Sequence, residues 1–182
     1  MAEIVMVTEE IAAALVRVQN ILQRRPQTGL HDDTPATARW AGGLRVISSH
    51  ANGTQVASDM SAELGGTGDQ VSPGWLFRAG LAACLTTCIA IQSAAAGIAL
   101  STLEVRATSR SDLRGLFGMC ESDGERVGAG PIAAGLTVRI AAPGVDAAEL
   151  DRLVERSYLQ SPISAALREA VPVSLTIEAV GN

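Results

Sequence analysis

One stretch without any charged side chain, residues 79–100, limits the possible folds of this chain more than any other feature. It lies in a segment that starts with Ser72 and Pro73 and ends near Gly97. Proline suits the first turn of a helix, and glycine suits the residue that follows the last turn. The pattern therefore predicts one long helix over residues 73–96. Because small or apolar residues occupy every face, we expect this helix to be buried on all sides.

The same uncharged run is long enough to cross a bilayer. It consists mostly of Ala, Gly, Thr, Ser and Gln, and the segments around it alternate like the strands of a water-soluble domain. We therefore prefer a central core helix to a transmembrane helix and expect no membrane partner. The chain begins without a basic region, and Glu9 and Glu10 interrupt its first apolar segment, so we expect no secretory signal.

The composition narrows the class of protein further. Apolar residues make up 47% of the 182 residues but aromatic residues only 3%, so few large side chains fill the core and a second subunit is expected to complete it. The net charge of −5 and the scattered Lys and Arg residues argue against a nucleic-acid site. Three cysteines without a CxxC pair and only two histidines indicate neither a disulfide framework nor a zinc site. We expect no cofactor and a reducing, cytoplasmic location.

The first third of the chain contains a helix, a linker and two strands. Apolar residues at helical spacing predict an amphipathic helix over residues 8–25, and the polar residues 26–36 are interpreted as a linker. Strand-like content predicts strands over residues 37–50 and 54–60, and the Ala51-Asn52-Gly53 turn between them predicts a hairpin. Residues 64–68 are rich in glycine and are expected to form a flexible connection.

The last third alternates between strands and helices. Apolar and polar residues alternate over 101–111 and 133–141, which predicts two half-buried strands joined by a long mobile connection. Asp146 is a candidate N-cap for a helix to Tyr158. A short helix over 162–170 and a final strand over 172–180 follow. The order predicts an α+β domain with antiparallel sheet over residues 37–182, after an N-terminal helix and linker over residues 1–36.

Two cysteines lie in the middle of the predicted long helix. Cys84 is either a small core residue or a nucleophile in a dry pocket. Cys88 lies one turn later, where Cβ atoms are roughly 5–6 Å apart, beyond the ~3.8 Å that a disulfide prefers. We therefore interpret Cys88 as a core residue. Cys120 lies in the mobile connection and is interpreted as incidental, and His31 and His50 are expected to be exposed.

Several short motifs, taken in their order along the chain, resemble the OsmC/Ohr family of osmotically induced and organic hydroperoxide resistance proteins. They are Gly-Gly-Leu-Arg-Val-Ile-Ser-Ser at residues 42–49, the Ser72-Pro73 helix start, and Cys84 within Ala-Ala-Cys eleven residues after the proline. Residues 160–167, Gln-Ser-Pro-Ile-Ser-Ala-Ala-Leu, resemble the second family signature, in which Cys-Pro-Val opens the last helix. The resemblance covers residues 37–180 and leaves the N-terminal helix outside.

The resemblance implies an intertwined homodimer, with long central helices and antiparallel sheets wrapped around them. It also implies a thiol peroxidase. In the family, the cysteine of the central helix attacks an organic hydroperoxide and becomes a sulfenic acid. A second cysteine condenses with it to a disulfide, which a dithiol reductant reopens. An arginine stabilises the thiolate and is held by a glutamate that follows the helix-start proline.

This sequence departs from the family pattern around the cysteine. Ser161 stands where the second cysteine belongs, and Gly74 stands where the glutamate belongs. The resemblance gives the arginine role to Arg45, which comes one residue later than in the pattern and so faces the other side of a strand. Arg39 is the second candidate. Cys84 matches the family position directly.

Two functions are compatible with these residues. In the first, Cys84 reduces a small-molecule hydroperoxide, Arg45 or Arg39 favours its thiolate, and an external thiol reductant replaces the second cysteine. In the second, peroxidase chemistry is lost and a non-catalytic dimer binds a small ligand in a pocket beside Cys84. Ser161 is not expected to act as an activated serine nucleophile, because no histidine stands in a suitable motif.

Overall fold

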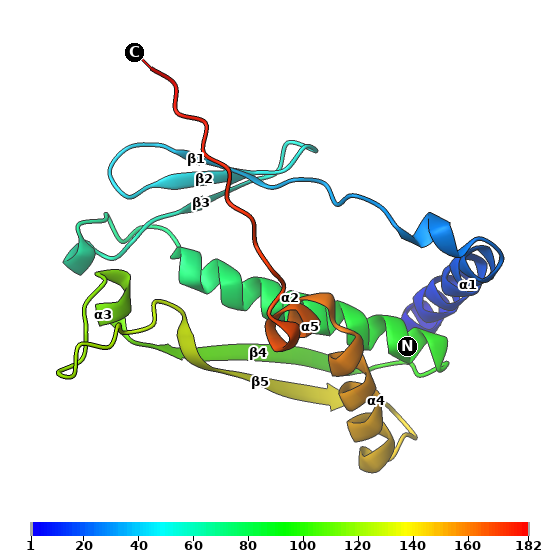
Figure 1. The fold of residues 1–182 in the computed structure, drawn as a ribbon. Coiled ribbons are helices and arrows are strands. Elements are labelled where there is room, and N and C mark those ends of the chain that lie inside the picture. Colours follow the sequence, from blue (N-terminus) through cyan, green and yellow to red (C-terminus); the bar gives the residue numbers. More distant parts are fainter. Residues whose placement is uncertain (1, 182) are drawn as a thin grey trace.

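A computed structural model describes residues 2–181 of the chain. The long helix α2 (Pro73–Ala95) runs through the middle of the molecule, with a three-stranded sheet on one side and a two-stranded sheet on the other (Figure 1). All pairings within the two sheets are antiparallel. The predicted α+β class with antiparallel sheet and a long helix is therefore confirmed.

Helix α2 begins and ends where the sequence predicts. The Ser72 side chain caps it by accepting a hydrogen bond from the Trp75 backbone N–H at 3.1 Å, and Pro73 occupies its first position. Gly97 follows its end with a φ of +68°, the left-handed conformation that glycine adopts without strain.

The burial of α2 differs from the prediction. One face is buried through residues Leu81, Leu85, Ile89, Ser93 and Ala94, and it packs against β4, α4 and α5. Ala83 and Thr87 are exposed. The expectation of burial on all sides is therefore wrong for a single chain, because these two residues of the second face remain exposed. Of the helices within these residues, α2 is also the one that is long and apolar enough to cross a membrane by length and composition.

The first sheet contains β1 (Thr37–Trp40), β2 (Val46–Ser49) and β3 (Gln55–Ser58) in that order. The expectation of one continuous strand over residues 37–50 is wrong, because Gly42 and Gly43 have φ values of +99° and +56° and turn the chain back on itself. The hairpin between β2 and β3 is confirmed, with Ser49 paired to Gln55.

The second sheet contains β4 (Thr102–Ser111) and β5 (Pro131–Ala141), close to the predicted bounds. The connection between them contains the short helix α3 (Leu113–Leu116). The Arg114 guanidinium holds this connection together through ion pairs with Asp112 and Glu121, at 2.6 and 2.8 Å. The connection that the sequence predicts to be mobile thus contains internal ion pairs.

Helices α4 (Ala147–Gln160) and α5 (Pro162–Glu169) follow the second sheet. Asp146 caps α4 as predicted, accepting a hydrogen bond from the Glu149 N–H at 2.7 Å. A small core of Ile98, Leu150 and Leu153 packs α4 against the residues that follow α2.

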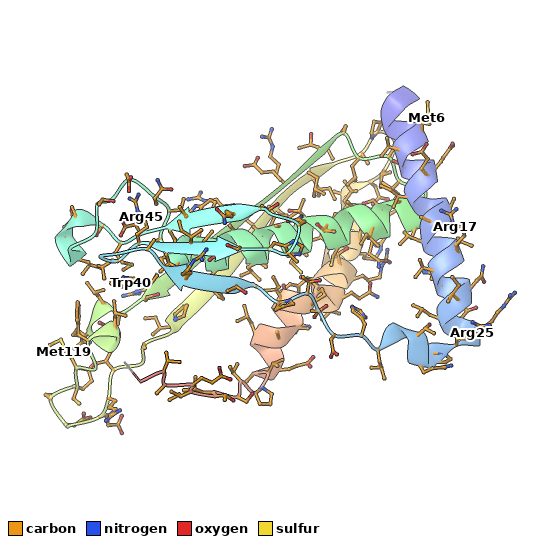
Figure 2. All side chains as sticks on the ribbon, turned by 90° about the horizontal axis from the view of Figure 1, so that it is seen from above. Met6, Arg17, Arg25, Trp40, Arg45 and Met119 are labelled. Carbon is orange, nitrogen blue, oxygen red and sulfur yellow. The ribbon has the colours of Figure 1, made fainter. Side chains whose placement is uncertain are left out.

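The N-terminal helix α1 (Ala2–Arg24) begins earlier than predicted and is followed by a 3₁₀ turn at Pro26–Gly29. Helix α1 packs against α2 and crosses it near the C-terminal end of α2 (Figure 2).

The end of the chain does not form the predicted strand. Residues 172–180 leave α5 as an extended segment without a ladder partner anywhere in residues 2–181 (Figure 1). Val173 is 93% exposed and Ile177 is 79% exposed, although the sequence alternates as a strand would. The prediction is wrong for the isolated chain because the segment pairs with no sheet edge there.

Candidate functional site

The site is centred on the half-buried thiol of Cys84, in the middle of α2. The Ser161 Oγ donates a hydrogen bond to the Cys84 Sγ at 3.2 Å. The backbone N–H of Ile163, in the first turn of α5, approaches the same sulfur at 3.5 Å. The fold therefore brings together two sequence-predicted site residues that lie 77 positions apart.

Ser161 lies between α4 and α5 and is fully buried, with 0% of its surface exposed. Its hydroxyl accepts a hydrogen bond from the Ser164 Oγ at 3.1 Å, and Ser164 is itself only 2% exposed. Sequence reasoning missed Ser164 and the Ile163 amide. The three-residue spacing of the two serines at a helix start, on either side of Pro162, was the available signal, because it places both on one face of α5.

Cys88 lies one turn further along α2 and is half-buried. Its Sγ lies 3.9 Å from the Gln160 carbonyl oxygen as a weak donor. Burial and the neighbouring Cys84 raise the pKa of Cys88 above its usual value. Burial therefore disfavours a thiolate at Cys88.

Arg45 is engaged away from Cys84. Its guanidinium donates to Thr67 at 2.7 Å and to Asp59 at 3.3 Å, and it forms a short ion pair with Asp69. The Thr67 hydroxyl and Arg45 lower the pKa of Asp69 to about 2. Asp59 and Asp69 form a carboxylate cluster around Arg45. Among residues 2–181 Arg45 therefore binds this cluster, and the structure does not bring it to the sulfur as the resemblance implies.

The carboxylate cluster also corrects the expectation for the glycine-rich connection. Asp59 is 2% exposed and accepts hydrogen bonds from the backbone and hydroxyl of Thr67. A Cβ at Gly66 would lie 2.0 Å from the Met60 carbonyl oxygen, so the chain can pass there only as glycine. The connection is fastened to the first sheet rather than loose.

The other candidate residues lie apart from the sulfur. The Arg39 side chain is exposed on β1 and forms no hydrogen bond or ion pair within the described part of the chain. A Cβ at Gly74 would lie 3.7 Å from Nη1 of Arg78, which itself donates to the Ser109 hydroxyl at 3.1 Å. A glutamate at position 74 would therefore meet Arg78 first.

The remaining candidates are on the surface. Cys120 is exposed in the β4–β5 connection, and His31 and His50 are exposed as expected. Across residues 2–181, no three His, Cys, Asp or Glu side chains are grouped so that they could hold a metal ion.

A cavity of about 440 Å³ lies among α2, β5, α4 and α5. Its lining is mostly apolar and includes Leu81 and Leu85, the two buried residues of α2 nearest to Cys84 in the sequence. Ser164 also lines it, and so does Arg168, whose Nη1 donates to the Tyr158 carbonyl. Cys84 does not line this cavity, but the Ser164–Ser161 pair connects the two.

Comparison with known proteins identifies relatives of this chain. The family model described as OsmC-like protein matches residues 66–176. An organic hydroperoxide resistance protein of Xanthomonas axonopodis pv. citri (strain 306) is 35% identical over 120 residues, which cover 63% of this chain and 72% of the relative.

Solved structures share the fold. An OsmC-like protein from Mycoplasma pneumoniae matches with a TM-score of 0.63 and 17% identity, covering 76% of this chain and 89% of the other. An organic hydroperoxide resistance protein from Vibrio cholerae O1 biovar eltor, solved with captopril in one of its active sites, matches with a TM-score of 0.52 and 23% identity, covering 76% and 88%.

Proposed function

The chain belongs to the OsmC-like protein family. We propose that it is a thiol-dependent organic hydroperoxide peroxidase that acts through Cys84. The observation that carries the proposal is the convergence of two hydrogen-bond donors, one of them from the buried Ser161, on one sulfur. The Ser161 hydroxyl and the Ile163 amide lie 3.2 and 3.5 Å from the Cys84 Sγ. Hydrogen-bond donors favour the thiolate, which is the nucleophilic form.

The proposed first step is a two-electron reduction of the peroxide. The Cys84 thiolate attacks one oxygen of the O–O bond, an S–O bond forms and the O–O bond breaks. The leaving alkoxide takes up a proton and departs as the alcohol. Sulfur is thereby oxidised to a sulfenic acid.

The second step requires a thiol from outside the chain. Ser161 has no sulfur to condense with the sulfenic acid. An external thiol attacks the sulfenic sulfur of Cys84, which releases water and forms a mixed disulfide. A second external thiol attacks this mixed disulfide, so the two external thiols leave as a disulfide and the Cys84 thiol is restored. Turnover with dithiols should be slow, and excess peroxide should readily over-oxidise Cys84.

We propose that the protein works as a homodimer built from residues 37–182, with residues 1–36 as an extension. The exposed face of α2 and the unpaired segment 172–180 support this assembly, because both are apolar surfaces that a second copy would cover. A reducing compartment such as the cytoplasm would supply the external thiol.

The alternative is a non-catalytic protein that binds a small ligand. The cavity of about 440 Å³ near the serine pair favours it, since its size and apolar lining suit a small molecule. The captopril-bound Vibrio cholerae protein offers a precedent for a ligand in this fold.

Consumption of cumene hydroperoxide in the presence of a thiol distinguishes the two functions. The peroxidase proposal predicts consumption by the wild type, its loss in Cys84→Ser, and its retention in Cys120→Ser, which removes an exposed thiol of the β4–β5 connection. Equal activity of wild type and Cys84→Ser would leave the ligand-binding function as the better account.

A further inference from the structure

We propose that Ser161 is a catalytic residue that holds the Cys84 sulfur in its anionic form, with Ser164 as its positioning residue, an inference that rests on the proposed peroxidase function. The Ser161 hydroxyl thus has a role of its own, because it donates a hydrogen bond to the Cys84 sulfur. Together with the Ile163 amide, the two serines form a donor set that requires no arginine.

The first observation concerns how α5 begins. Ser161 is the N-cap residue of α5, yet its side chain makes no capping hydrogen bond. Serine at this position normally accepts a hydrogen bond from the N2 or N3 amide. Ser72 does so at the start of α2. At α5 the sulfur of Cys84 takes the place of that acceptor, because the Ile163 amide approaches it at 3.5 Å.

The second observation is the direction of the hydrogen bonds. Ser164 donates to Ser161 at 3.1 Å, and Ser161 donates to the Cys84 Sγ at 3.2 Å. Each hydroxyl in such a chain polarises the next, and the last acceptor is the sulfur. Because Ser161 and Ser164 are 0% and 2% exposed, water does not compete with these bonds.

The third observation is the charge around the sulfur. Arg45 faces Asp59 and Asp69, and Arg78 donates to Ser109. Within residues 2–181 the hydrogen-bond partners of the Cys84 sulfur are therefore uncharged groups, namely the Ser161 hydroxyl, the Ile163 amide and the Cys88 thiol. A thiolate at the N-terminus of α5 gains from the helix dipole in addition to these bonds. The neutral donors thus act where the family pattern has an arginine.

The pH dependence of Cys84 alkylation tests this inference without any peroxide. Removing a hydrogen bond to an anionic sulfur makes the thiolate less favourable, so the alkylation profile of Cys84 should move to higher pH. We expect Ser161→Ala to show this shift, with alkylation at pH 7 about tenfold slower or more. Ser164→Ala should shift the profile in the same direction by less, since it acts through Ser161.

Ser157→Ala is the matched control. Ser157 is also 0% exposed and lies on α4, but its hydroxyl donates to the Leu153 carbonyl rather than to sulfur. It should leave the Cys84 profile in place. Equal shifts for Ser157→Ala and Ser161→Ala, or none for Ser161→Ala, would overturn the inference. If Ser161→Ala fails to fold, an unshifted profile in Ser164→Ala would overturn it instead.

The outcome is separable from that of the proposed function. A wild type that consumes no peroxide would refute the peroxidase, while the alkylation profiles would still report whether the serine pair stabilises the thiolate.

Discussion

At the scale of single residues, the proposed peroxidase chemistry depends on position 161, which would decide how a sulfenic acid at Cys84 is resolved. The Ser161 Oγ lies 3.2 Å from the Cys84 Sγ, so the side chain is in place but its chemistry is that of a hydroxyl. A sulfur in the same position would complete the pair that the family uses. The difference between one-cysteine and two-cysteine chemistry therefore depends on a single atom.

The short distance between the two side chains predicts the behaviour of Ser161→Cys. After one equivalent of hydroperoxide, the introduced thiol should condense with the Cys84 sulfenic acid and release water. Non-reducing peptide mapping should show a disulfide between Cys84 and position 161. A variant that folds, keeps Cys84 alkylatable and still forms no such disulfide would show that the two side chains are not neighbours in solution.

The sequence predicts some of these residues and not others. Cys84 and Ser161 follow from the position and order of short motifs, so sequence reasoning finds them. The engagement of Arg45 does not follow, because Asp59 and Asp69 meet it only once β2, β3 and the glycine-rich connection have folded. Nor does the donor role of Ser164, which depends on the start of α5 lying against α2.

At the scale of elements, the carboxylate cluster fastens the glycine-rich connection to the first sheet. Asp69 has its pKa lowered from 3.8 to about 2 by Thr67 and Arg45. A carboxylate with a lowered folded-state pKa stabilises the fold above its unfolded-state pKa. That contribution is lost as the pH falls through the window from about 4 to about 2.

Asp69→Asn should therefore change the acid response of the protein. The wild type should lose thermal stability between pH 4 and pH 2, and the variant should start lower at neutral pH and lose less over the same window. Melting curves at several pH values give the measurement. Asp32→Asn, which alters an exposed carboxylate of the linker, is the control and should follow the wild type. Parallel wild-type and Asp69→Asn curves would contradict the role given to the cluster.

Elements with strong local signals are predicted well. The caps of α2 and α4 and the Asn52-Gly53 hairpin depend on residues that are adjacent in the sequence, and the structure contains all three. The sequence does not reveal the break between β1 and β2, because the residues on both sides of Gly42 and Gly43 have strand-like content. Residues 172–180 alternate as a strand would, but they join no sheet within residues 2–181. Whether a sheet edge is available cannot be predicted from the local pattern of residues.

At the scale of the whole molecule, one chain leaves much apolar surface uncovered. Strand β1 is exposed throughout, and α2 keeps an open face of small residues. Residues 172–180 present Val173, Leu175 and Ile177 to solvent at 79 to 93% exposure. Surfaces of this kind are expected to be buried by a partner.

We therefore predict an obligate homodimer in which residues 172–180 of each chain pair with the other copy. Leu175→Asp combined with Ile177→Asp should weaken the dimer, because both side chains lie on the apolar face of the segment. Ser174→Asp combined with Thr176→Asp adds the same charge to the polar face and should leave the dimer intact. Sedimentation of the wild type as a folded monomer at micromolar concentration would refute the assembly.

We propose Cys84 as the peroxide-reducing thiol, and we expect no second cysteine of the chain to resolve it. Mass spectrometry of the wild type after one equivalent of cumene hydroperoxide, under non-reducing conditions, tests it most directly. We expect one added oxygen on Cys84, no disulfide to Cys88 or Cys120, and recovery of the free thiol when an external thiol is added. Oxygen on another cysteine, or a disulfide between Cys84 and either of the other two, would contradict it.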